Sequence, residues 1–132
     1  METTTGLDIL VLAVANAANL LMVGIFVARG LNRPRLARLG FGIPLLFLGI
    51  PLTAASLWSL VLARPSWAVL LPLPLVGFLV LEWLLDYVLK LDFRHTRIVG
   101  PYLGLYYVAF MLMVGYTFVA LPAWGFATLA TY

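Results

Sequence analysis

The sequence contains no cysteine, a single histidine and few charged residues, which make up 10% of its 132 positions. Without cysteine the chain has no disulfide, no thiolate-bound iron–sulfur cluster or zinc ion, and no cysteine nucleophile. A haem or zinc site needs more ligands than the one histidine, His95, supplies. We therefore expect the protein to bind no metal and no cofactor.

The sequence also lacks the short motifs of the common enzyme classes. It has no nucleophile elbow, no HExxH zinc motif and no glycine-rich loop for phosphates. Its one lysine, Lys90, lies at the end of an apolar segment and is poorly placed for a Schiff base. We expect that the protein is not an enzyme. Because Glu2 and Asp8 stand where a cleavable signal peptide is basic, we expect the first apolar segment to stay in the mature protein.

What the sequence has in abundance is hydrophobic residues, which make up 64% of the chain. Long apolar segments lie at about residues 9–28, 39–63, 67–89 and 99–121. Each holds roughly 20 to 25 residues, enough at about 1.5 Å per residue to cross about 30 Å of hydrocarbon. Short connections make successive helices antiparallel neighbours. The sequence therefore predicts a single all-α integral membrane domain over residues 1–132, a four-helix up-down-up-down transmembrane bundle.

Two further features concern the shape of these segments. The second contains the repeated triplets Gly42-Ile-Pro44 and Gly49-Ile-Pro51, and proline removes a helical hydrogen bond, so we expect bends there. The last stretch, residues 122–132, is apolar and aromatic but too short to cross a bilayer. We expect it to lie at the membrane interface, and the alternative is that it opens a further span.

Seven of the eight basic residues fall in the gaps that follow the first and third segments. Basic loops favour the cytoplasmic side, so both gaps are expected in the cytoplasm, with the N- and C-termini opposite and the plasma membrane as the location. The same residues are candidate contacts for anionic lipids. Nucleic acid is not an expected partner, because no aromatic residues for base stacking alternate with these basic ones. The seven are Arg29, Arg33, Arg35, Arg38, Lys90, Arg94 and Arg97.

Glu82 and Asp86 are the carboxylates inside an apolar segment, four residues apart and so on one helical face. A charge at mid-bilayer costs at least about 2.5 kcal/mol. We therefore expect Glu82 to face the bundle interior or a subunit interface and to hydrogen bond to a residue of the first or fourth segment. Asp86 is expected within reach of Lys90. The candidate polar intramembrane site comprises Glu82, Asp86, Asn19, Asn16 and Tyr106.

The small residues of the apolar segments favour close helix packing. With no catalytic motif, they lead us to expect an interaction or accessory subunit of a membrane complex, or of a homo-oligomer. The expected partners are membrane lipids and other membrane subunits or further copies of the chain. The alternative is a small transporter or proton-linked carrier that uses Glu82 and Asp86, since intramembrane acids are common in proton relays.

Overall fold

The structure, a computed structural model, describes residues 2–91 and 93–132, and the described chain is 86% helical with no strand. Four of its helices are long and apolar enough to cross a membrane: Thr5–Gly30, Leu36–Val61, Ser66–Val88 and Val99–Ala120. The predicted all-helical fold and its four long apolar helices are therefore confirmed.

The first and fourth of these helices are regular. They are α1 (Glu2–Gly30) and α6 (Val99–Ala120). α1 ends where Asn32 takes the left-handed conformation, with φ of 57°. The Arg33 amide then donates to the carbonyl of Ala28, 2.8 Å away. This pairing satisfies a carbonyl that the end of the helix would otherwise leave open.

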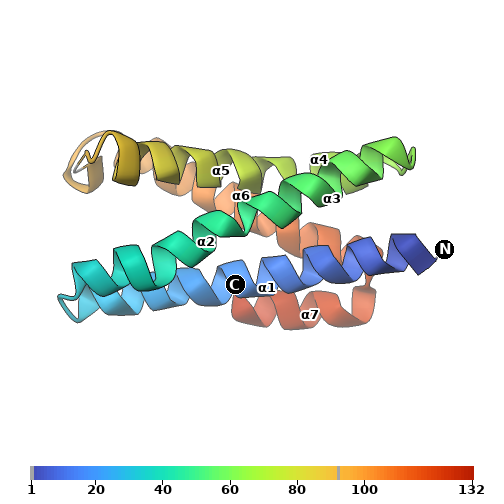
Figure 1. The fold of residues 1–132 in the computed structure, drawn as a ribbon. Coiled ribbons are helices and arrows are strands. Elements are labelled where there is room, and N and C mark those ends of the chain that lie inside the picture. The colour runs from blue at the N-terminus through green and yellow to red at the C-terminus, as the bar shows by residue number, and fades with distance from the viewer. Residues whose placement is uncertain (1, 92) are drawn as a thin grey trace.

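The second is a chain of three shorter pieces: the π-helix η1 (Leu36–Gly42), α2 (Ile43–Phe47) and α3 (Gly49–Val61). α2 and α3 meet at a bend at Leu48, which Figure 1 shows clearly. Pro51 has no N–H to donate to the carbonyl of Phe47, so the expected proline bend falls here.

The third long helix is also interrupted, at Pro72. It consists of α4 (Ser66–Leu70), α5 (Leu73–Trp83) and the π-helix η2 (Leu84–Val88). It ends because Lys90 takes a left-handed conformation, with φ of 51°. The four-residue spacing that places Glu82 and Asp86 on one helical face therefore does not continue to Lys90.

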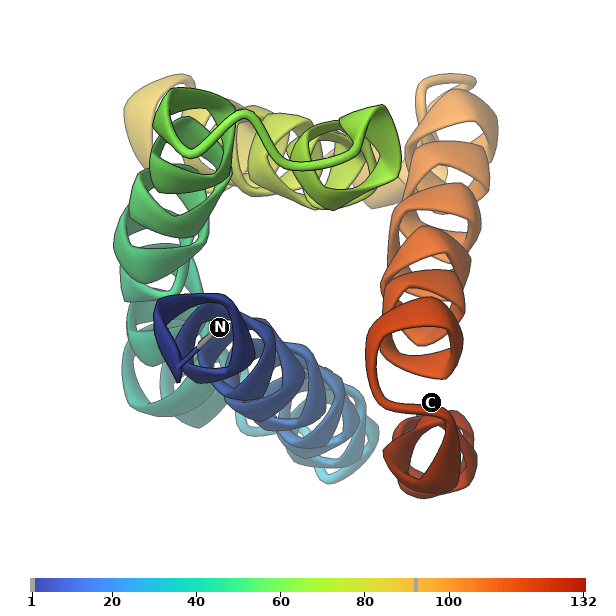
Figure 2. The same ribbon diagram turned by 90° about the vertical axis from the view of Figure 1, so that its right-hand side faces the viewer.

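The chain connections gather at two ends of the bundle. The basic end carries the loops 31–35 and 89–98, the second of which includes the short helix η3 (Phe93–His95). The N-terminal end carries the start of α1 and the turn 62–65 (Figure 1). Seen along the bundle, α1, α2 with α3, α5 and α6 form the four sides (Figure 2).

The interior is filled by small residues on α1 and by aromatic rings on α5 and α6. Ala15 and Ala18 are buried on α1 and let its neighbours approach. The ring of Phe78 lies between those of Tyr102 and Phe110, with centroids 5.3 and 5.9 Å away. Such tilted and edge-on ring pairs pack a core closely and add to its stability.

The last helix, α7 (Pro122–Thr131), runs back along the bundle. Pro122 disfavours helical geometry at Leu121, so α6 ends at Ala120 and the chain turns there. α7 then packs along α6 and α1 (Figures 1 and 2). Its last turn reaches Asn19, near the middle of α1. The interfacial position expected for 122–132 stays a prediction, and in the structure this segment lies lengthwise against α6 and α1.

We predict that the turn onto α7 depends on the absence of a side chain at Gly125. A Cβ there would lie 2.5 Å from the ring of Phe118. Gly125→Ala should therefore destabilise the protein by about 1 to 3 kcal/mol, as overpacking does. Gly104→Ala is the control, because its Cβ meets nothing within 4 Å, and it should be neutral or stabilising by up to about 1 kcal/mol. Thermal unfolding in mild detergent measures both, and equal stability of the two variants would contradict the α6–α7 packing.

Candidate functional site

Glu82 lies on α5 with only 3% of its surface exposed. Its Oε2 accepts a hydrogen bond from the hydroxyl of Tyr102 on α6. The expected inward orientation and the hydrogen bond from the fourth segment are both present. The donor is Tyr102 instead of Tyr106, because Tyr106 turns into the aromatic core, with its ring 4.8 Å from that of Phe110.

Asp86 lies in η2, one turn nearer to the basic end. Its Oδ2 is 3.4 Å from Nη2 of Arg29 at the end of α1. Its backbone carbonyl accepts a 2.9 Å hydrogen bond from Arg38 in η1. Among the described residues, Asp86 therefore forms an ion pair with Arg29 and not with the expected Lys90. The reason is that Lys90 leaves the helical conformation, so it no longer lies one turn beyond Asp86 on the same helical face.

Asn16 and Asn19 hold α7 against α1 instead of reaching Glu82. Asn19 donates to the carbonyl of Thr128 and to the hydroxyl of Thr131, at 3.2 and 2.9 Å. Asn16 donates to the hydroxyl of Thr128 at 3.1 Å and accepts from that of Thr131 at 2.9 Å. Thr128 is fully buried. These two amides are therefore structural links between the first and last helices, and the candidate site of five residues is divided into separate contacts.

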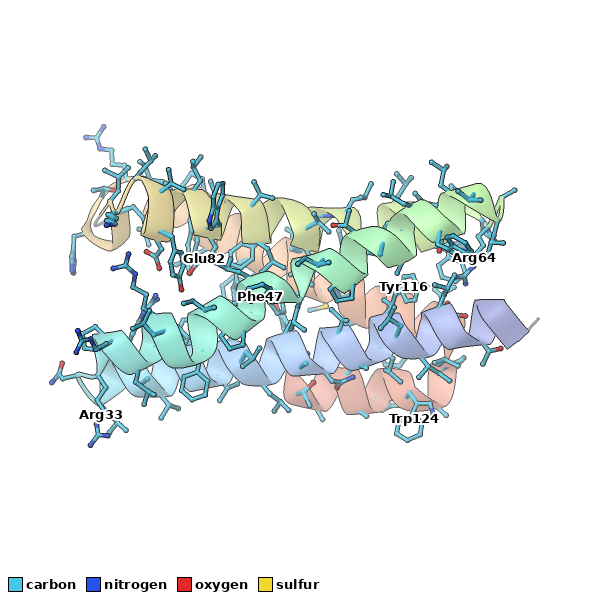
Figure 3. The ribbon with its side chains drawn as sticks, in the orientation of Figure 1. Arg33, Phe47, Arg64, Glu82, Tyr116 and Trp124 are labelled. Carbon is cyan, nitrogen blue, oxygen red and sulfur yellow. The ribbon has the colours of Figure 1, made fainter. Side chains whose placement is uncertain are left out.

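A buried polar cluster that the sequence analysis did not identify lies at the N-terminal end (Figure 3). The guanidinium of Arg64 is 2.7 Å from Oδ1 of Asp8, and their side chains are 6% and 10% exposed. The hydroxyl of Tyr116 donates to the same carboxylate oxygen at 2.7 Å. Arg64 also donates to Ser59 at 3.3 Å. The cluster therefore joins α1, α3 and α6.

Local backbone geometry directs Arg64 into the bundle. Ala63 takes a left-handed conformation with φ of 50°, and the Arg64 amide donates back to the carbonyl of Ser59. Burial lowers the pKa of Arg64, but its hydrogen bonds and attraction to Asp8 and Tyr116 outweigh this, so the net pKa is raised. The guanidinium therefore stays charged. One signal for it was present in the sequence, since Arg64 is the single basic residue outside the two basic gaps.

A lateral groove of about 770 Å³ opens between α2 and α3 on one side and α5 on the other. Its lining is apolar on both walls. The α3 wall includes the small residues Gly49, Thr53 and Ala54, and the α5 wall includes Val80 and Trp83. The bend at Leu48 lies beside this groove, next to Phe47, which Figure 3 labels.

The basic residues fall into two groups. Arg29 and Arg38 are engaged with Asp86 inside the bundle. Arg33 and Arg35 instead line an open hollow of about 550 Å³ at the tip of the 31–35 loop, where Figure 3 shows Arg33. Lys90 and Arg97 are exposed on the other loop, and the side chain of Arg94 lies outside the described part of the structure.

We find no group of three or more histidine, aspartate and glutamate side chains that could hold a metal ion among the described residues. Comparisons of the chain with protein-family models, with curated proteins and with solved structures give no match.

We predict that Asp8→Leu destabilises the protein by about 3 to 5 kcal/mol, because it leaves the buried Arg64 guanidinium without its counter-charge. The double variant Asp8→Leu/Arg64→Met should recover most of this loss, since apolar groups of similar size can replace a buried ion pair. Tyr116→Phe should cost only about 1 kcal/mol. Denaturation midpoints in mild detergent test the set. If Asp8→Leu and the double variant are equally unstable, the ion pair is not what joins these helices.

Proposed function

We propose that the chain is an integral protein of the plasma membrane, an up-down-up-down bundle with both basic loops in the cytoplasm and the N-terminus opposite. The support is the length and apolarity of its four long helices and the confinement of seven basic residues to one end. Within it the protein acts as an interaction subunit that holds a transmembrane helix of a larger membrane complex.

The observation that carries this proposal is the lateral groove between α3 and α5. Gly49 and Thr53 are four residues apart on one face of α3, with Ala54 beside them, and all three line the groove. Small residues at this spacing let the backbone of a second helix approach closely, and the resulting van der Waals packing is one of the forces that drive helix association in lipid. The hydroxyl of Thr53 donates a hydrogen bond to the carbonyl of Gly49 at 2.7 Å. This hydroxyl therefore needs no hydrogen-bond partner from a helix that packs in the groove.

The length of the groove fits a helix better than a compact ligand. Its lining runs from Ile43 to Leu57 on the second long helix, and these 14 helical steps span about 21 Å. That is most of the roughly 30 Å thickness of the hydrocarbon core. The opposite wall of the groove runs along the third long helix, from Val76 on α5 to Tyr87 on η2.

The shape of the groove points to a different subunit instead of a symmetric dimer. A two-fold interface places the same surface of both copies face to face. Two concave grooves that face each other would leave a void instead of filling it. The partner therefore presents a convex helix, so we assign the groove to a transmembrane helix of another membrane protein.

The polar residues inside the bundle support a structural role for its interior. Glu82, Asp86 and Asp8 each take part in a contact between different helical segments, and the contacts of Asp86 and Asp8 join segments that lie far apart in sequence. A carrier that uses Glu82 and Asp86 is the second candidate, favoured by the burial of the Glu82 carboxyl within an apolar helix.

We predict that filling the groove abolishes partner binding. Ala54 is exposed in the isolated chain, so Ala54→Leu adds volume to the groove without disturbing the core. Ala13→Leu is the matched control, an exposed alanine on α1 outside the groove. A photo-cross-linking residue at Leu57 should attach to a transmembrane segment of one other protein in native membranes, and one at Val108 on α6 should not. Ala54→Leu should remove this product and Ala13→Leu should keep it.

Other products at Leu57 would contradict the proposal. A product of two copies of the chain would assign the groove to self-association, and a lipid adduct alone would assign it to lipid. Equal product from the two alanine variants would also contradict it.

The carrier hypothesis predicts a different result. Purified protein in proteoliposomes, with an imposed pH gradient and a pH-sensitive dye inside, should then conduct protons, and Glu82→Gln should abolish the flux. Under the interaction proposal the wild type shows no flux above protein-free vesicles. Gln can still accept the hydrogen bond from Tyr102, so a lost flux would not reflect a lost fold.

A further inference from the structure

The hollow at the tip of the 31–35 loop differs from the rest of the basic end in its chemistry. Two arginines, Arg33 and Arg35, lie beside the exposed apolar residues Leu36 and Leu39, and its lining contains no acidic residue. Leu36 and Leu39 are 44% and 52% exposed. The hollow therefore joins a strongly positive rim to an apolar wall.

The backbone on both sides of this rim is held in place. The Arg33 amide donates to the carbonyl of Ala28, and the carbonyl of Arg33 accepts from the amide of Ala37 at 3.1 Å. Pro34 between the two arginines restricts its own φ angle. Little backbone freedom remains to be lost when a ligand binds, which favours affinity.

The four arginines around this loop are not equivalent. Arg29 and Arg38 are drawn toward Asp86 by an ion pair and a hydrogen bond, whereas Arg33 and Arg35 are exposed at the hollow. A guanidinium offers five N–H donors in a fork that matches the oxygens of a phosphate. Arg33 and Arg35 are thus the pair suited to an external anion.

We propose that this hollow binds one anionic membrane phospholipid, with its phosphate at Arg33 and Arg35 and an acyl chain along Leu36 and Leu39. The charge of the rim selects the headgroup, and the exposed leucines call for a ligand with a hydrocarbon chain. The inference rests on the membrane insertion included in the proposed function, but not on the occupant of the α3–α5 groove.

Two double variants that remove the same charge test the proposal. Arg33→Ala/Arg35→Ala alters the hollow, and Lys90→Ala/Arg97→Ala alters the other exposed loop at the same end. Each purified protein is placed in mixed micelles of phosphatidylglycerol and phosphatidylcholine, and the bound lipid is counted by native mass spectrometry. Far-UV circular dichroism checks that both variants keep their helices.

The wild type should retain phosphatidylglycerol over phosphatidylcholine. Arg33→Ala/Arg35→Ala should lower this retention by about tenfold or more, and Lys90→Ala/Arg97→Ala should keep it within about twofold of the wild type. Equal losses in the two variants would overturn the proposal in favour of diffuse surface charge. A wild type without preference for phosphatidylglycerol would also overturn it.

Two further arms locate the lipid and identify what is recognised. Ala54→Leu, which fills the groove, should leave lipid retention unchanged; if it removes the lipid while Arg33→Ala/Arg35→Ala keeps it, the lipid lies in the groove and the assignment is wrong. Glycerol phosphate, which has no acyl chain, should not displace the lipid at equal concentration. Its displacement of the lipid would show that the hollow binds phosphate groups as such.

Discussion

A polar group buried between apolar helices is costly unless another group of the protein forms a hydrogen bond or ion pair with it, and in this bundle several such partners lie on other helices. This requirement joins the bundle at three levels. Asp8 and Arg64 join its N-terminal end, Asn19 and α7 join its middle, and Glu82 with Tyr102 joins it toward the basic end. The first two contacts link segments that are distant in sequence, and the third links the consecutive long helices α5 and α6, so together they constrain how apolar helices of similar composition are arranged.

The same contacts explain where the groove can exist. Among the described residues, the side-chain hydrogen bonds that join the second and third long helices lie at the basic end, as between Tyr87 and Arg38. Farther along, α3 and α5 meet through apolar side chains. The bend at Leu48 and the small residues Gly49 and Ala54 widen the space between them. A partner helix would therefore dock where the bundle is joined by packing alone.

Hydropathy was enough to predict the four long helices, since about 20 consecutive apolar residues have few alternatives to a helix in lipid. The cost of a buried charge likewise predicted the inward orientation of Glu82. The partners were harder to predict. Asp86 pairs with Arg29 because η2 and the left-handed Lys90 end the regular four-residue spacing. The partners of Asn19 depend on the fold-back of α7, which is a tertiary event that local sequence patterns do not describe.

The two π-helices show how the basic end is closed. In η1 the carbonyl of Arg38 accepts a 2.6 Å hydrogen bond from the hydroxyl of Tyr87 and a second one from the backbone amide of Ile43. In η2 the backbone carbonyl of Asp86 lies in the last turn, where a helix leaves carbonyls without a backbone partner. It accepts a hydrogen bond from the guanidinium of Arg38. Each irregular helix thus supplies the side chain that satisfies the other. The guanidinium of Arg38 also lies 5.2 Å from the centre of the Tyr87 ring. Arg38 is therefore held between Asp86 and Tyr87. A charge count treats Arg38 and Arg33 alike, but this contact holds Arg38 within the fold, whereas Arg33 stays exposed.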